Sequence, residues 1–401
     1  MRFLLYPDWL IDGSGDDARE GVAVLVNGAT IEAVGPAREL ATMPGVTAIR
    51  WENGTLLPGL INNHVHLNLP GDNTPMLPWI DNQSDASLAL WAVANASASL
   101  AAGITTVRDC GGRGTTVLDT RNALGTGLVG GAAIISCGWP LTITGGHTRP
   151  MGGEVDGVDG VRRMVRQLVS LGVDYIKVMA AGGGTPGSLP QYPSFTPEEL
   201  RAIVETAHDL GRKVAMHCIA TASIDRAVAA GADMIEHASF YAPDLVPRFD
   251  EAVAARLAQS GIPVTPTLQV ARDLIDLQSP ADDLVAWGER RDAGLEFAAG
   301  LREMGVTLLA GSDAGWRATA FSTFWKELDE LTKVGMSPVQ AVAAATGAPA
   351  RVLGIDGRIG TLAPGLQADL VVVDGNVAVD IGCLRHVRAI FQAGLQVASP
   401  A

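Results

Sequence analysis

Five segments of the sequence place potential metal ligands at the ends of apolar, strand-like runs. The first segment is His64-Val65-His66, in which alternation along a strand points both imidazoles to the same face. Four later segments each contribute one candidate, and these are Lys177, His217, His237 and Asp313. An isolated His-x-His pair is structural about as often as it binds metal. Six such side chains at the ends of five strand-like runs predict a metal centre, because imidazole and carboxylate groups suit divalent ions.

Lys177 is the unusual member of this set. In Ile176-Lys177-Val178 the two apolar residues share one face, so Lys177 points the other way, toward the interior. An ammonium ion is costly to bury, whereas a neutral amine could take up carbon dioxide to form a carbamate with two oxygens that bridge two cations. The alternative is that Lys177 pairs with a carboxylate or extends to solvent.

Such a centre could hydrolyse a carbonyl compound. Two divalent cations about 3.5 to 4 Å apart lower the pKa of a bridging water and polarise a substrate carbonyl. Asp313 could accept the proton of the attacking hydroxide and then deliver it to the leaving nitrogen or oxygen, which would make it a catalytic residue as well as a ligand.

The elements that must position these residues are eight strand-like runs, each followed by a helix-length segment. Eight apolar runs alternate with helix-length segments, and one helix start is marked by Thr196-Pro197-Glu198-Glu199, with a capping threonine and a glutamate at the third position. The runs cover residues 59–66, 103–110, 132–138, 174–180, 213–218, 234–238, 263–268 and 307–313. This size and rhythm predict an α/β fold, with a (β/α)8 TIM barrel over residues 58–357, whose active site lies where the strands end.

Both ends of the chain differ from the middle in their pattern of apolar and turn residues. Short alternating runs are joined by Asn-Gly and glycine-rich turns near the start, and similar runs follow residue 358. We therefore expect residues 1–57 and 358–401 to build one small β domain around the barrel.

Composition excludes several classes of partner. The chain of 401 residues is 47% hydrophobic and 18% charged, with a formal net charge of −14, so neither nucleic acid nor an anionic membrane surface is an expected partner. No apolar run reaches the ~18 residues of a transmembrane helix, and the first residues are too short for a secretory signal. The four cysteines lie far apart and are expected to be reduced thiols of a cytoplasmic protein.

Taken in order, these segments resemble the amidohydrolase superfamily. The resemblance rests on residues 57–67 around His64, residues 172–179 around Lys177, residues 311–314 around Asp313 and residues 360–372 near the end of the chain. It implies that the terminal β domain is a small β-sandwich beside the barrel. It also implies two divalent metal ions, with zinc expected. The implied ligands are His64, His66 and Asp313 for one ion, His217 and His237 for the second, and a carbamate derived from carbon dioxide on Lys177 as the bridge.

Within the superfamily, the lysine strand and the glycines after it look most like Xaa-Pro dipeptidases, imidazolonepropionase-like proteins and hydrolases of aryl amides, carbamates and ureas. The segment 144–149 resembles a loop whose histidine faces the scissile carbonyl, so His147 is expected to be catalytic and substrate-binding, the alternative being a surface-loop histidine. Arg149, Tyr192 and Tyr241 are further expected substrate contacts. Two positions depart from the pattern: Asn62 replaces the usual Asp, and Ile219 stands where the dipeptidases often carry a Tyr.

The resulting prediction is a hydrolase of small molecules that cleaves a peptide-like, N-acyl or aryl amide by means of a metal-bridged hydroxide, as an amidase or dipeptidase does. Carbamate, urea, ester or lactone hydrolysis at the same site is the first alternative. A heterocycle deaminase is the second, which Lys177 disfavours because that branch usually lacks it, and a silent scaffold is the third. The resemblance also implies a homo-oligomer.

Overall fold

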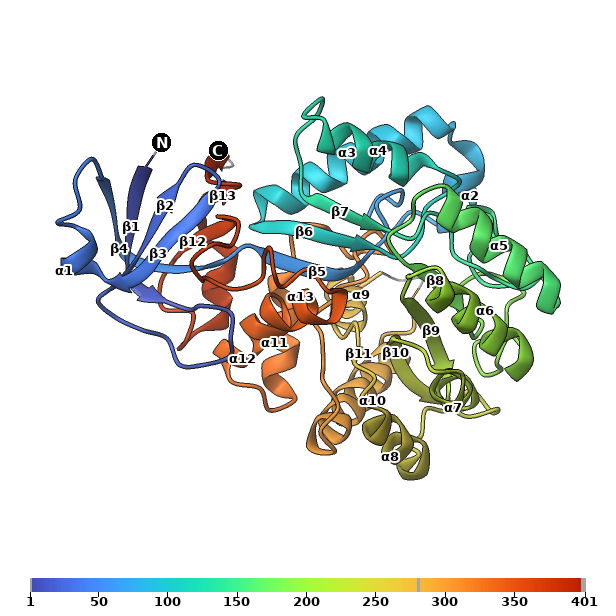
Figure 1. The fold of residues 1–401 in the computed structure, drawn as a ribbon. Coiled ribbons are helices and arrows are strands. Elements are labelled where there is room, and N and C mark those ends of the chain that lie inside the picture. Colours follow the sequence, from blue (N-terminus) through green and yellow to red (C-terminus); the bar gives the residue numbers. More distant parts are fainter. Residues whose placement is uncertain (1, 280–281, 398–401) are drawn as a thin grey trace.

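A computed structural model describes residues 2–279 and 282–397 of the chain, and it has the α/β architecture that the sequence predicts (Figure 1). Strands from both chain ends lie together at one side of the molecule. The larger part, built from the middle of the chain, lies beside them. Residues 1 and 398–401, which belong to the predicted β domain, lie outside the described residues.

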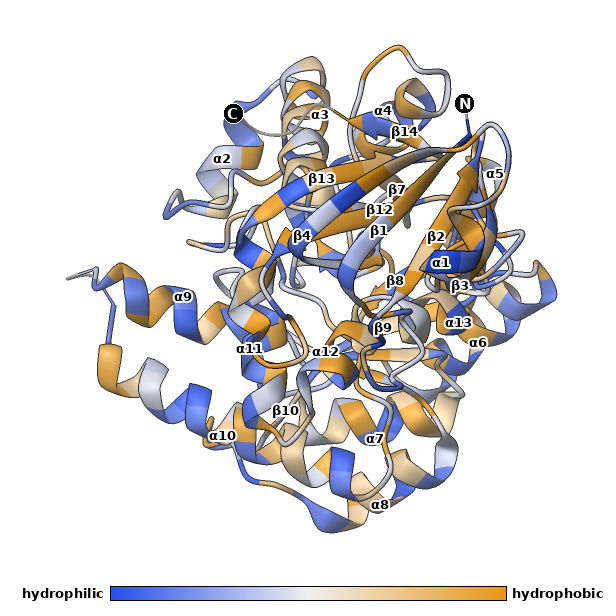
Figure 2. Cartoon of the chain, turned by 90° about the vertical axis from the view of Figure 1, so that its left-hand side faces the viewer, coloured by the Kyte–Doolittle hydropathy of each residue, from blue (hydrophilic) through white to orange (hydrophobic). Residues whose placement is uncertain are grey.

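The terminal strands form one seven-stranded sheet in the order β14-β13-β12-β4-β1-β2-β3. Its strands are β1 (Arg2–Leu10), β2 (Val22–Asn27), β3 (Thr30–Pro36), β4 (Thr47–Pro58), β12 (Leu370–Asp374), β13 (Val387–Gln392) and β14 (Leu395–Val397). The sheet curls, because Phe3 of β1 stacks on Phe391 of β13 at a centroid distance of 5.4 Å although β4 and β12 lie between these strands. The apolar residues of this sheet, orange along the ribbon in Figure 2, enclose a core of their own.

Seven of the eight predicted inner runs form parallel strands. One sheet contains β5 (Leu60–Val65), β6 (Ile104–Asp109) and β7 (Ala133–Ser136). A second contains β8 (Ile176–Met179), β9 (Val214–Ala220), β10 (Met234–Tyr241) and β11 (Val264–Thr265). Nearly all of their residues are buried, as expected for parallel strands covered by helices.

The prediction of a regular strand over 307–313 is wrong. Isolated parallel bridges, Val264 with Leu308 and Val65 with Ala314, connect this segment to the strands on either side. It does not extend into a ladder, because the Ala310 N–H donates to the carbonyl of Ala344 at 2.8 Å instead of to a neighbouring strand, and because Asp313 at its end has a left-handed backbone with φ of 58°. A further bridge connects Val178 of β8 to Leu141 in the segment that follows β7. In the described residues the parallel strands therefore form two separate sheets, and isolated bridges connect the segments between them.

Helices surround the parallel strands (Figure 1). The capping box predicted at Thr196 is confirmed, because its side chain accepts from the backbone of Glu199, whose carboxylate accepts from the Thr196 N–H. The helices are α1 (Ala37–Leu40), α2 (Met76–Asn82), α3 (Asp85–Ala101), α4 (Thr116–Gly125), α5 (Val158–Ser170), α6 (Pro197–Asp209), α7 (Thr221–Ala230), α8 (Glu251–Ser260), α9 (Gln269–Leu277), α10 (Leu284–Glu303), α11 (Trp325–Lys333), α12 (Pro338–Ala344) and α13 (Gly347–Leu353), with 3₁₀ turns η1 (Arg149–Met151) and η2 (Ile381–Arg385). In the described ranges none of them combines the length and apolar character that a bilayer-crossing helix requires.

Candidate active site

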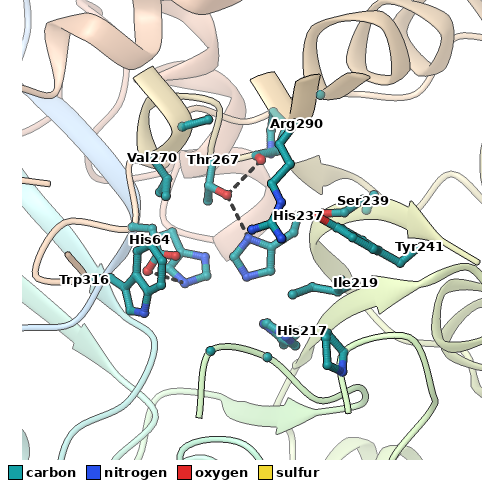
Figure 3. Close-up of a pocket in the computed structure, with 18 of the residues that line it drawn as sticks. His64, His217, Ile219, His237, Ser239, Tyr241, Thr267, Val270, Arg290 and Trp316 are labelled. Carbon is teal, nitrogen blue, oxygen red and sulfur yellow. Dashed lines mark hydrogen bonds and ion pairs between the residues drawn. The ribbon is translucent and has the colours of Figure 1, made fainter. Parts of the chain in front are cut away.

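The predicted ligands meet in one cavity of about 410 Å³ at the carboxyl ends of the parallel strands (Figure 3). The six predicted metal ligands all line it, together with His147 and Tyr241. Arg149 and Tyr192 do not line it: the Arg149 guanidinium donates to the Pro186 carbonyl at 3.0 Å, and Tyr192 is exposed. A role in substrate binding stays a prediction for these two residues.

His64 and His66 are both oriented by hydrogen bonds at Nδ1. His64 donates to the Glu236 carboxylate at 2.9 Å, and His66 donates to the carbonyl of Gly111 at 2.9 Å. A carboxylate and a carbonyl oxygen can only accept a hydrogen bond, so Nδ1 carries the proton in both rings. Each Nε2 is therefore left with a free lone pair. The two Nε2 atoms lie 3.5 and 3.4 Å from the same oxygen, Oδ1 of Asp313. These three donor atoms converge as ligands of one cation would.

His217 and His237 are also each oriented by a hydrogen bond at one ring nitrogen, which is Nε2 in His217 and Nδ1 in His237. Nε2 of His217 donates to the Gly182 carbonyl at 3.0 Å, which frees Nδ1. The Thr267 hydroxyl donates to the Pro266 carbonyl, so its oxygen accepts from Nδ1 of His237 at 2.7 Å and Nε2 is freed (dashed line, Figure 3). The two rings lie 4.6 Å apart between centroids.

These four histidines are neutral near pH 7. Burial, followed by the charge of Lys177, holds the pKa of His64 well below its usual range. Burial likewise lowers the pKa of His66 to about 4 and depresses the pKa values of His217 and His237 strongly. Neutral imidazole is the form that binds a metal ion, so the site holds its histidines ready as ligands.

Two polar atoms beside these histidines have no hydrogen-bond partner among residues 2–279 and 282–397. Nζ of Lys177 is fully buried on β8, and Oδ1 of Asp313 is buried at the end of the segment 307–313. Burial also raises the pKa of Asp313 to about 7. Unsatisfied buried groups are rare, and a bound ion or covalent group is a common reason for them. The donor set therefore fits the two cations and the lysine carbamate that the sequence predicts.

The comparison with known proteins decides the family. A profile described as the amidohydrolase family matches residues 55–397. The chain belongs to the amidohydrolase family. This confirms the resemblance inferred from the strand-end motifs, and it makes the protein a hydrolytic enzyme.

Similar proteins are enzymes of the same kind. Ochratoxinase from Aspergillus niger is 29% identical over 430 residues, covering 96% of this amidohydrolase and 84% of ochratoxinase. Its crystal structure superposes with a TM-score of 0.84 at 26% identity, covering 100% and 96% of the two chains. A Xaa-Pro dipeptidase with bound methionine gives a TM-score of 0.86 at 27% identity, covering 99% of this chain and 100% of that one. A prolidase complexed with N-methylphosphonate-L-proline gives 0.86 at 28% identity, with 100% of both chains covered.

Glu236 and Arg108 are parts of the amidohydrolase site that the sequence reasoning missed. Both are fully buried, and Arg108 pairs with Glu236 while its Nε donates to the Asn63 carbonyl at 2.7 Å. Burial would raise the pKa of Glu236, but the Arg108 guanidinium and the other positive neighbours outweigh it and hold that pKa well below its usual range. Glu236 therefore stays charged and orients His64. The available signal was a carboxylate directly before the strand-end His237.

The strict alternation of side chains along a strand would not predict this role of Glu236. Neighbouring strand residues point to opposite faces, yet Glu236 and His237 both approach His64. They do so because the backbone turns left-handed at His237, with φ of 70°, and again at Ala238, with φ of 52°. Such angles are uncommon outside glycine, and they cluster at functional sites.

The two departures from the family pattern have defined surroundings. Asn62 links β5 to the segment 307–313: its Nδ2 donates to Oγ of Ser312 at 2.7 Å, and its Oδ1 accepts from the Ser312 N–H at 3.0 Å. Ile219 lines the cavity beside His217 and presents an apolar surface there (Figure 3).

His147 lies against the histidine cluster, with its ring centroid 4.8 Å from that of His217. Its Nδ1 is 2.9 Å from Oγ1 of Thr185, which also accepts from the Thr148 N–H at 3.0 Å. Burial lowers the pKa of His147 to about 3, so the ring is neutral. Gly183 packs on the ring so closely that a Cβ there would lie 2.5 Å from Nε2.

Proposed function

We propose that this amidohydrolase is a binuclear metal-dependent enzyme that hydrolyses amide bonds. The observation that carries the proposal is the set of available ligand atoms. Four neutral histidines each have a ring nitrogen with a free lone pair. Beside them, Nζ of Lys177 and Oδ1 of Asp313 have no hydrogen-bond partner in the described residues. His64, His66 and Asp313 would hold one ion, and His217 and His237 the other. Zinc suits these ligands.

Lys177 would bridge the ions as a carbamate. Its neutral Nζ would form a bond to the carbon of carbon dioxide and release one proton, which leaves a group with one negative charge and two oxygens. The carbamate would place this negative charge beside the histidines, where it would attract divalent cations. The absence of any hydrogen bond to Nζ in the described chain supports this, since no protein group competes for the amine.

When bound, divalent cations would supply Lewis acidity and a lowered pKa for a shared water. Asp313 would receive the proton of that water and pass it to the leaving nitrogen. Thr185 already accepts the Thr148 N–H, so its own proton is available for Nδ1 of His147. His147 would then carry its proton on Nε2 and donate it to the substrate carbonyl oxygen.

The proposed fold is a (β/α)8 barrel over residues 58–357, with the small β domain formed by residues 1–57 and 358–401 as a sandwich-like unit. The isolated bridges on both sides of the segment 307–313, and between Leu141 and Val178, support closure of the barrel. The curl of the terminal sheet supports the sandwich-like unit. The cytoplasmic location and the homo-oligomer stay predictions.

The choice of an amide is supported by the relatives, which are named as a dipeptidase and a prolidase. The test is hydrolysis by zinc-loaded protein of dipeptides, N-acyl amino acids and aryl amides, beside carbamates, ureas, esters and heterocyclic amines. We expect amide turnover that is lost on chelation and in Asp313→Asn, with an unchanged circular dichroism spectrum. Turnover of esters alone, ammonia release from a heterocycle, or full activity in Asp313→Asn would contradict the proposal.

A further inference from the structure

Helices α9 and α10, which lie between β11 and the segment 307–313 in the sequence, form part of the mouth of the cavity. The two helices pack together and project from the body of the molecule in Figure 2. They contribute Val270, Trp287, Arg290 and Phe297 to the cavity wall. Side chains of these two helices would contact the part of a substrate that extends away from the histidine cluster.

Arg290 is a cation without an ionic partner at this mouth. Within residues 2–279 and 282–397 it forms no ion pair and no hydrogen bond, and its side chain is exposed. Its neighbour Arg291 also lines the cavity, but Arg291 is held by Glu330 at 2.8 Å. The other charged residues of the wall, Lys177 and Asp313, belong to the proposed metal site.

Aromatic rings hold Arg290 in place. Its guanidinium carbon lies 4.7 Å from the centroid of Trp287 and 6.0 Å from that of Tyr241 (Figure 3 shows Arg290 and Tyr241). A ring attracts the face of a guanidinium and leaves its in-plane N–H donors free. Arg290 therefore presents an unused fork of donors, which matches the two oxygens of a carboxylate.

The rest of the outer wall is mostly apolar and aromatic, with Ser239 near Tyr241 as a polar member. Trp316 lies edge-on to Trp287 at 6.4 Å between centroids, and Ile219 offers no hydrogen-bonding group. An anion gains little from the chain as a whole, which has a net charge of −14, so a local cation decides whether one is bound here.

We propose that Arg290 is a specificity residue that binds a carboxylate of the substrate. The substrate class is an amide that carries a carboxylate next to an aromatic or other apolar group, with the apolar group against Trp287 and Trp316. This substrate class rests on the proposed amide hydrolysis, whereas carboxylate binding by Arg290 does not.

The first test compares two amides that differ only in the carboxylate, N-benzoyl-L-phenylalanine and N-benzoylphenethylamine. We expect the zinc-loaded enzyme to favour the carboxylate by about tenfold or more in kcat/KM, as for a charged hydrogen-bonded pair. Arg290→Gln should remove this preference, because kcat/KM should fall far more for the acid than for the neutral amide. Arg302→Gln, the same change on α10 away from the cavity, should keep the preference. A preference that persists in Arg290→Gln would overturn the proposal.

The second test needs no turnover. Calorimetry should show that 3-phenylpropanoate binds the zinc-loaded protein more tightly than the neutral 3-phenylpropanamide, and that Arg290→Gln weakens only the carboxylate, by about tenfold. Arg290-dependent binding without hydrolysis of either amide would remove the hydrolase proposal and retain the carboxylate site. Undetectable binding, or binding equal in both variants, would overturn the carboxylate site even if amides are hydrolysed.

Discussion

Replacing Glu236 by Gln should destabilise the fold without creating a cavity. Glu236 accepts from two buried donors, Nδ1 of His64 and the guanidinium of Arg108. Gln has nearly the same shape but offers one acceptor oxygen and one NH₂ group. If the Gln oxygen faces Arg108, its NH₂ group faces Nδ1 of His64, which must then move its proton to Nε2, and the buried Arg108 loses its counter-charge.

The magnitude follows from the burial of both partners. Arg108 and Glu236 are each 0% exposed, so water cannot compensate for the lost charge. Breaking a buried ion pair by changing one partner costs about 3–5 kcal/mol. The 2.7 Å bond from Nε of Arg108 to Asn63 remains, which places the expected loss near the lower end, about 3 kcal/mol. That is a large part of the ~5–15 kcal/mol that stabilises most domains.

Urea unfolding followed by tryptophan fluorescence and circular dichroism measures this loss. Glu289→Gln makes the same chemical change on exposed α10 and should stay within about 0.5 kcal/mol of the wild type. Combining Glu236→Gln with Arg108→Met should cost less than the sum of the single changes, because no unpaired charge is left. If Glu236→Gln unfolds like Glu289→Gln, the buried pair does not have the role assigned to it.

Two further predictions concern Glu327, which is buried against the start of α9, and Gly183, which lines the cavity. Burial, with the Glu330 and Asp273 carboxylates adding to it, raises the pKa of Glu327 from 4.5 to about 8. The folded state therefore keeps a proton that the unfolded chain releases, so this group lowers stability as pH rises from about 4.5 to about 8 and changes nothing above that range. Glu327→Gln should reduce the stability difference between about pH 5 and about pH 8 in urea unfolding, and an undiminished difference would contradict the assignment. Gly183→Ala puts a Cβ 2.5 Å from Nε2 of His147, so kcat should fall by about tenfold or more through displacement of the ring. The same change in a His147→Ala background should have no further effect, and a further loss there would show that Gly183 acts otherwise.

Local pattern predicted much of this protein. Alternation placed His64 and His66 on one face and Lys177 inward, and the structure brings all three to one cavity with His217, His237 and Asp313. The family inferred from these motifs is confirmed. That the six residues bind metal stays a prediction. These inferences succeed because a parallel strand presents its side chains with a fixed period, so residue type and spacing carry the geometry.

Other features depend on contacts that a local pattern does not contain. The segment 307–313 is not a regular strand because its Ala310 N–H donates to the distant carbonyl of Ala344 and because Asp313 at its end adopts a left-handed backbone. The role of Glu236 depends on the left-handed turn at His237, and that of Arg290 on how α10 packs over the cavity. Arg149 begins the short 3₁₀ turn η1 and Tyr192 lies on a loop, and neither lines the cavity, because the sequence does not specify the course of the segments that carry them.

The central claim is a binuclear centre bridged by Lys177, and metal content per chain tests it most directly. Protein expressed with zinc and bicarbonate should contain about two ions, and Lys177→Ala should lose most of them while its circular dichroism spectrum is retained. About one ion per chain, unchanged in Lys177→Ala, would contradict the bridged centre, as would a folded wild type that binds none.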